Sequence, residues 1–307
     1  MSSPIKTVVV GTTLSEASDS IVAGAAAVAR ATGAALHLVN SYELPIPYGS
    51  VPYGVTSLFD EPGLVRGLHA MLEEQVRRLL PDVPKPVLHV ASGPAHRTIV
   101  ELARRTRADL IAVGAADTFL GRVFGTTASR VLRAAECPVL LIRGHLKMPP
   151  SRVLIPVDLS PLSAEEMATG LDVLEQIGLE RGQGVVEAFY STPPLGYEGF
   201  VTGFDPTVRE KAASDELAEF LVANVLGIGW NLQQRSAFGP AREEILGRIQ
   251  HFGPDLVVLG THGAGGFERF LLGSVAETVL QRAPTSVLVV PPKAAREEKP
   301  AAAQNAA

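Results

Sequence analysis

The residues best suited to chemistry form a glycine-rich motif in the second half of the chain. Gly260-Thr261-His262-Gly263 follows an apolar run, nine residues separate it from Gly273, and Ser274 precedes a helix expected at Val275–Arg282. Glycines lack a Cβ atom, so their backbone can approach a ligand closely. Ser274 is predicted to be the N-cap of the helix, whose first free amides form an anion site. The motif therefore indicates a loop that binds a polyphosphate.

A carboxylate, Asp158, follows the first apolar run of the same half. In an open α/β sheet the ligand lies where the strand order reverses, between two central strands. If the run ending at Val157 neighbours the run ending at Gly260, Asp158 faces the same crevice and accepts hydrogen bonds from a base or a ribose. The alternative is that Asp158 only caps the helix that follows Ser160, and the sequence leaves both interpretations open.

Residues for catalysis or for a metal ion do not assemble into a motif. The seven histidines include no His-x3-His pair, and Cys137 is the one cysteine. No Walker A, dinucleotide-binding or Gly-x-Ser-x-Gly sequence occurs, and no general base is evident. We therefore expect no catalytic residue and no metal site. His262 is expected to touch a ligand through its backbone or to be an exposed loop side chain, and Glu165-Glu166 to lie on a solvated helix face.

The elements that must position these residues occur twice. Three pairs of segments resemble each other: Lys6–Ser15 and Arg152–Ser160, Ala108–Gly114 and Pro254–Gly260, and the apolar runs Val139–Ile142 and Val287–Val290. This self-similarity indicates a duplication. In each half, β-branched runs alternate with longer segments of helical spacing, which predicts five parallel strands covered by helices on both faces. The predicted fold class is α/β, with two tandem five-stranded, parallel-sheet, Rossmann-like domains.

Length and composition fit two soluble domains. The 307 residues are 46% hydrophobic and 19% charged, enough for two cores of ordinary size. We place the first domain at residues 4–145, the second at 151–291, and a disordered tail at 292–307, which is rich in Ala, Glu and Lys. The boundary segment contains Pro149-Pro150.

The charge and the cysteine content of the chain indicate which partners and which cellular compartment to expect. The net charge is −5 and no basic run occurs, which argues against nucleic acid as a partner. No apolar run is long enough to span a membrane. A single cysteine excludes an intramolecular disulfide and fits a cytoplasmic location.

Together these residues resemble the universal stress protein family, over nearly all of residues 4–291 as a tandem pair. The resemblance is carried by Val153–Ser160, Asp255–Gly263, Gly273-Ser274 and Thr285–Val290. ATP-binding members of that family use the same Gly-x2-Gly-x9-Gly-Ser/Thr motif. The resemblance implies the adenine nucleotide alpha hydrolase-like fold and ATP as the ligand, with any Mg²⁺ held by the phosphates.

The resemblance also implies a set of contacts to the nucleotide. Pro156, Val157 and Asp158 would lie along the adenosine, and Tyr190 near the adenine. The residues expected along the ribose and phosphates are Gly260, His262, Gly263, Gly273, Ser274 and Val275.

The first half departs from this pattern. Thr13 stands where Asp158 stands, Asp117 replaces the glycine that matches Gly263, and seven residues rather than nine separate Asp117 from Gly125. A carboxylate about 4 Å from a phosphate near a protein surface costs on the order of 4 kcal/mol. We therefore expect the first half to bind ATP poorly and to have a structural role.

Three functions compete. The first is a stress-response or signalling protein that binds ATP in its C-terminal domain, with no catalysis or very weak hydrolysis, and acts through an unknown protein partner. The second is a nucleotide-independent scaffold or chaperone-like protein. In the resembled family the apolar closing strands pair across dimers, which implies that here they pair within one chain as a pseudo-dimer and that two chains can form a homodimer. The third is an enzyme of the wider adenine-nucleotide hydrolase superfamily. The sequence does not separate ATP from AMP or a cyclic nucleotide.

Overall fold

A computed structural model describes most of the chain. The described residues are 3–44, 60–82, 85–115, 125–192, 205–225, 230, 232–261 and 272–292, with the backbone of 117–118 and 121–122. Of the tail expected at 292–307, all residues after 292 lie outside them, as do His262 and Gly263.

The N-terminal half alternates strands and helices. In chain order it consists of β1 (Thr7–Gly11), α1 (Glu16–Thr32), β2 (Ala35–Tyr42), α2 (Glu61–Leu79), β3 (Val87–Ser92), α3 (Ala95–Thr106), β4 (Leu110–Gly114), α4 (Thr126–Ala134) and β7 (Val139–Ile142). Between β4 and α4, β5 (Asp117–Thr118) and β6 (Gly121–Arg122) form a separate antiparallel pair.

The C-terminal half repeats this order. It consists of β8 (Arg152–Val157), α5 (Pro161–Gln176), β9 (Val185–Thr192), α6 (Pro206–Asn224), β10 (Leu232–Phe238), α7 (Ala241–Phe252), β11 (Leu256–Gly260), α8 (Ser274–Arg282) and β12 (Ser286–Val290). The predicted α/β class and the five parallel strands of each half are confirmed.

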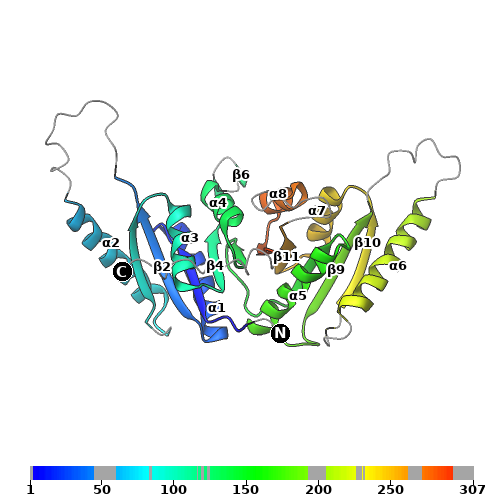
Figure 1. The fold of residues 1–307 in the computed structure, drawn as a ribbon, viewed down its shortest axis with the longest axis horizontal. Helices are drawn as coiled ribbons and strands as arrows, with labels where there is room; N and C mark the ends of the chain where they lie inside the picture. Colours follow the sequence, from blue (N-terminus) through cyan, green and yellow to red (C-terminus); the bar gives the residue numbers. More distant parts are fainter. Residues whose placement is uncertain are drawn as a thin grey trace, which may run out of the picture.

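All ten of these strands form one sheet, in the order β10-β9-β8-β11-β12-β7-β4-β1-β2-β3. Each half places its third, second, first, fourth and fifth strand side by side, so the order reverses between β1 and β4 and between β8 and β11. Within each half, neighbouring strands are parallel. Figure 1 shows the halves side by side, with α4 and α8 near the middle.

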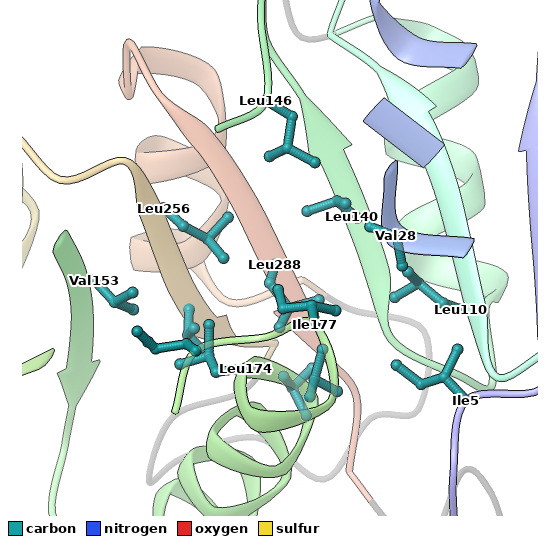
Figure 2. Packing of buried hydrophobic residues seen from close by; sticks show 14 of the residues in the cluster. Ile5, Val28, Leu110, Leu140, Leu146, Val153, Leu174, Ile177, Leu256 and Leu288 are labelled. Atoms are coloured by element: carbon teal, nitrogen blue, oxygen red, sulfur yellow. The ribbon is translucent and has the colours of Figure 1, made fainter. Parts of the chain in front are cut away.

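The inner strands are buried on both faces, because helices cover the sheet from both sides, whereas the edge strands β3 and β10 are partly exposed. Val8 and Val10 belong to one hydrophobic core, whereas Val9, between them, belongs to the other. Both cores include residues of both halves. Figure 2 shows the first core running from Leu110 and Leu140 to Leu256 and Leu288 without a break at the junction.

The two halves join through β7 and β12. These strands pair antiparallel, with Leu140 opposite Leu288, so the predicted pairing within one chain is confirmed. Arg143 donates its backbone amide to Ser286 Oγ at 3.1 Å and a guanidinium N–H to the Leu280 carbonyl at 2.6 Å. The junction therefore combines a strand ladder, a shared core and specific hydrogen bonds.

No helix in the described residues is long and apolar enough to cross a membrane.

An aspartate at the start of the fourth strand clamps the start of the first strand in each half. Asp109 Oδ2 accepts the amides of Lys6 and Thr7 at 2.8 and 3.0 Å. Asp255 Oδ2 accepts the amides of Ser151 and Arg152 at 2.8 and 3.0 Å. These bonds align the amino ends of the two central strands, and the carboxyl ends consequently meet at the opposite edge of the sheet.

The clamp in the C-terminal half also lowers the pKa of Asp255. Burial acts to raise this pKa, but hydrogen bonds from Ser151, Lys147 and the Arg152 amide outweigh burial and bring the pKa below its usual value. A carboxyl group whose pKa is lower in the folded than in the unfolded chain stabilises the fold above its unfolded pKa.

We predict that Asp255→Ala lowers the free energy of unfolding by about 2 kcal/mol at pH 7, because the carboxylate accepts several hydrogen bonds. The difference from the wild type should shrink as the pH falls below about 4, the ordinary aspartate pKa, since the wild type then loses the same interaction. Urea titrations at several pH values measure the free energy of unfolding of the wild type and the variant. Glu216→Ala, at an exposed position, is the control. Equal stability of wild type and D255A at pH 7 would contradict the clamp.

Candidate functional site

The reversal of strand order in the C-terminal half brings two strand ends together. β8 and β11 are parallel neighbours, with Val153 opposite Leu256 and Leu154 opposite Val257. Their carboxyl ends, at Val157 and Gly260, therefore lie at the same edge of the sheet. This adjacency is the condition under which Asp158 shares a crevice with the glycine-rich motif, and the structure meets it.

The turn after β8 is held by hydrogen bonds among polar side chains. Asp158 Oδ1 accepts from the amide and the hydroxyl of Ser160, at 3.0 and 2.6 Å. Ser160 in turn caps α5, since its Oγ accepts the Ser163 amide at 3.1 Å. The helix cap is therefore Ser160, and the exposed Asp158 holds Ser160 in place.

This turn also contains a leucine in the left-handed region. Leu159 has φ +63°, and its counterpart in the first half, Leu14, has φ +60°. For a residue with a side chain, this conformation costs roughly 1–2 kcal/mol. Such strain is typical of ligand-binding turns, and here both halves maintain it.

The glycine at the end of β11 makes room for a buried carboxylate from α5. A Cβ atom at Gly260 would overlap Glu166 Oε2, and Glu166 Oε1 accepts the Thr261 amide at 3.1 Å. Glu166 is 4% exposed. The expectation that Glu165-Glu166 lies on a solvated face is therefore wrong for Glu166 and holds for the exposed Glu165. The sequence pattern alone did not single out Glu166, although the spacing of Glu166 from Ser163 and Gly170 puts all three residues on one side of the helix.

The start of α8 lies close to the end of β11. The Gly273 amide donates to the Thr261 carbonyl at 2.9 Å, which closes the base of the loop between them. The helix begins at Ser274, and Gly273 is its N-cap, so the expectation that Ser274 is the N-cap is wrong by one residue. Gly273 has no side chain with which to cap this terminus. The amides of Ser274 and Val275 thus belong to a first turn that its own N-cap residue leaves uncapped, and Ser274 is exposed.

Pro156, Val157 and Tyr190 lie along the same edge. Pro156 and Val157 end β8, and Tyr190 is the residue of β9 opposite Val157. Val157 is buried and Tyr190 half-buried, so this part of the edge is apolar and aromatic. The described residues of the expected set therefore meet at the carboxyl edge of β9, β8 and β11, whereas His262 and Gly263 lie outside the described residues.

The corresponding edge of the N-terminal half is filled by its own polar network. Thr12 and Asn40 occupy the positions of Val157 and Tyr190. Asn40 Nδ2 donates to the Thr12 carbonyl at 2.9 Å, while Thr12 Oγ1 lies 3.0 Å from both Ser18 Oγ and Gln75 Oε1. These four side chains are all at least 90% buried. This network supports the structural role expected of the first half.

The N-termini of α4 and α8 nonetheless have almost the same backbone geometry. Gly125, the N-cap of α4, has φ −58° and ψ 141°, almost the same as −58° and 145° at Gly273. The difference between the halves therefore lies in side chains more than in the backbone of these termini. Among the described residues, no group of three or more His, Cys, Asp or Glu side chains could hold a metal ion.

Comparison with known proteins identifies both halves as copies of one domain. A model of the universal stress protein family matches the chain twice, over residues 4–143 and 150–291. A universal stress protein of Mycobacterium tuberculosis is 28% identical over 221 residues, which are 68% of this chain and 68% of that protein.

Solved structures agree in fold. A universal stress protein of Pseudomonas aeruginosa matches with a TM-score of 0.66 at 18% identity, covering 95% of both chains. One from Archaeoglobus fulgidus matches with a TM-score of 0.63 at 16% identity, covering 92% of this chain and 98% of that one. At these identities the structural matches establish the tandem fold alone.

We predict that Gly260→Ala destabilises the protein by about 2 kcal/mol, because the added methyl group displaces Glu166 from the Thr261 amide. Gly247→Ala is the matched control: Gly247 lies within α7 with no atom near its Cβ position, so this variant should gain up to about 1 kcal/mol. Chemical denaturation measures the free energy of unfolding of both variants and of the wild type. If G260A is as stable as the wild type, Glu166 does not pack against Gly260 as described.

Proposed function

This chain belongs to the universal stress protein family as a tandem member, and from that premise we propose that it is a stress-response or signalling protein that binds ATP in its C-terminal half. The observation that carries the proposal is the meeting of the β8 turn, the end of β11 and the start of α8 at one edge of the sheet. Ligands of open α/β sheets bind at such a reversal of strand order.

The described side chains fit the two ends of a nucleotide. The N-cap of α8 is a glycine, which provides no side-chain cap of its own, so the amides of the first turn and the positive end of the helix dipole suit phosphates. The edge at Val157 and Tyr190 is apolar and aromatic, which suits a purine base. Asp158 lies between these regions, where its carboxylate would accept hydrogen bonds from ribose hydroxyls. His262 and Gly263 are proposed to complete the phosphate contacts.

We propose that binding, rather than chemistry, is the function of this site. Asp158 Oδ1 is already engaged by the Ser160 amide and hydroxyl, and Glu166 is buried behind the end of β11. Neither carboxylate is placed to activate a water molecule, so any hydrolysis of ATP would be very weak. Any Mg²⁺ would be held by the phosphates of the nucleotide. The compartment that we propose for the protein is the cytoplasm.

A second candidate is a nucleotide-independent interaction scaffold. Two apolar residues are exposed on one face of each outer helix: Leu64 and Met71 on α2, and Val208 and Val222 on α6. A protein partner or a second copy of the chain would cover these side chains on binding. Sedimentation with and without ATP separates the candidates, since a scaffold of this kind assembles equally in both conditions.

We predict that the wild type binds ATP in isothermal titration calorimetry and that Asp158→Ala weakens binding about tenfold, the effect of losing one charge-assisted hydrogen bond. Thr13→Ala is the matched control, because Thr13 holds the same place in the first half and contacts Ser15 Oγ at 2.8 Å. It should leave the affinity unchanged.

A third variant tests the phosphate end of the same site. Gly263→Asp places a carboxylate where the first half has Asp117, and it should abolish measurable binding through repulsion of the phosphates. Absence of binding by the wild type at millimolar ATP would refute the proposed function. Equal affinities of wild type and D158A would refute the role of Asp158.

A further inference from the structure

Glu166 is a buried carboxylate for which the proposed site has so far provided no role. It lies on α5 at 4% exposure, next to the exposed Glu165. Taking a carboxylate out of water is costly unless hydrogen bonds or charges compensate for the loss of solvation. The contacts of Glu166 with the end of β11 must therefore be specific.

Those contacts are made to the residue at which the glycine-rich loop starts. Glu166 Oε1 accepts the Thr261 amide at 3.1 Å, and Thr261 is 5% exposed. The carbonyl of the same residue accepts the Gly273 amide at 2.9 Å. Thr261 is thus held on one side by α5 and on the other by the start of α8.

The N-terminal half shows what this position does without a carboxylate. Ile21 occupies the place of Glu166, and its Cδ1 lies against Gly114 as Glu166 Oε2 lies against Gly260. An isoleucine accepts no hydrogen bond. The Ala115 amide, which corresponds to that of Thr261, donates to the Ile142 carbonyl of β7 at 3.1 Å and so extends the strand ladder.

The two halves therefore direct the same amide to different places. In the first half it points along the sheet toward the fifth strand, and in the second it points toward helix α5. We propose that Glu166 is a positioning residue that turns the backbone at Thr261 toward α5 and thereby holds the end of β11 beside the first turn of α8, where the phosphates are proposed to bind. This role rests on the proposed function, because it concerns how the C-terminal half, and not the N-terminal half, forms a nucleotide site.

The charge of Glu166 and its hydrogen bond have opposite effects on a bound phosphate. The negative charge repels phosphates, whereas the bond to Thr261 holds the end of β11 beside the first turn of α8, where they are proposed to bind. Glu166→Gln removes the charge but keeps an oxygen acceptor, and Glu166→Met keeps the length of the side chain but removes the acceptor. Glu165→Gln removes the neighbouring exposed charge and is the control.

Calorimetric titration with ATP distinguishes the two effects. We expect E166M to bind ATP at least tenfold more weakly than the wild type, and E166Q and E165Q to stay within threefold of it. Tighter binding by both E166Q and E166M would show that repulsion dominates and would overturn the proposal. Equal affinities for all four proteins would overturn it as well.

Amide hydrogen exchange, followed by NMR without nucleotide, tests the geometry independently of ATP binding. The Thr261 amide should exchange at least 100-fold more slowly than an unprotected amide in the wild type, and E166Q should retain most of this protection. Rapid exchange in the wild type overturns the proposal, even if E166M fails to fold. A wild type that protects Thr261 yet binds no ATP would refute the proposed function alone.

Discussion

The parallel pairing of β8 with β11 is the contact on which the proposed site depends. Asp255 clamps the amino ends of these strands by accepting the Ser151 and Arg152 amides. The strands then run together to the other edge of the sheet, where the Asp158 turn and the end of β11 become neighbours. The Gly273–Thr261 hydrogen bond adds the start of α8 to the same place. The strand pairing and the Gly273–Thr261 bond join backbone to backbone, and the Asp255 carboxylate binds backbone amides, so the site is a property of the fold before any ligand is considered.

Duplication has produced two such edges, and their side chains have made them different. The N-terminal edge is closed by Thr12 and Asn40, whose polar groups bond to one another and to Ser18 and Gln75. The C-terminal edge has Val157 and Tyr190 at the same positions and a carboxylate, Glu166, in place of Ile21. The antiparallel pairing of β7 with β12 joins the two edges into one sheet. The first half therefore supports the second through the shared sheet and core.

Strand positions and the tandem repeat were predictable, because buried β-branched runs and their repetition can be recognised from residue types alone. The pairing of the closing strands was expected from the resemblance to the universal stress protein family. Details that depend on tertiary contacts were not predictable. The helix N-cap is Gly273 rather than Ser274, since the extended backbone at Gly273 decides where α8 starts. Sequence patterns also left open whether Asp158 caps α5, which Ser160 does. Glu166 resembled an ordinary surface acid, because only the approach of Gly260 and Thr261 explains its burial.

A crystal structure of the protein grown with ATP would show whether the C-terminal edge binds the nucleotide. We expect a nucleotide in the C-terminal half, with its phosphates against the amides of Ser274 and Val275 and its adenosine between Asp158 and Tyr190. Nucleotide bound in the N-terminal half, or an empty C-terminal edge at saturating ATP, would contradict the proposed site.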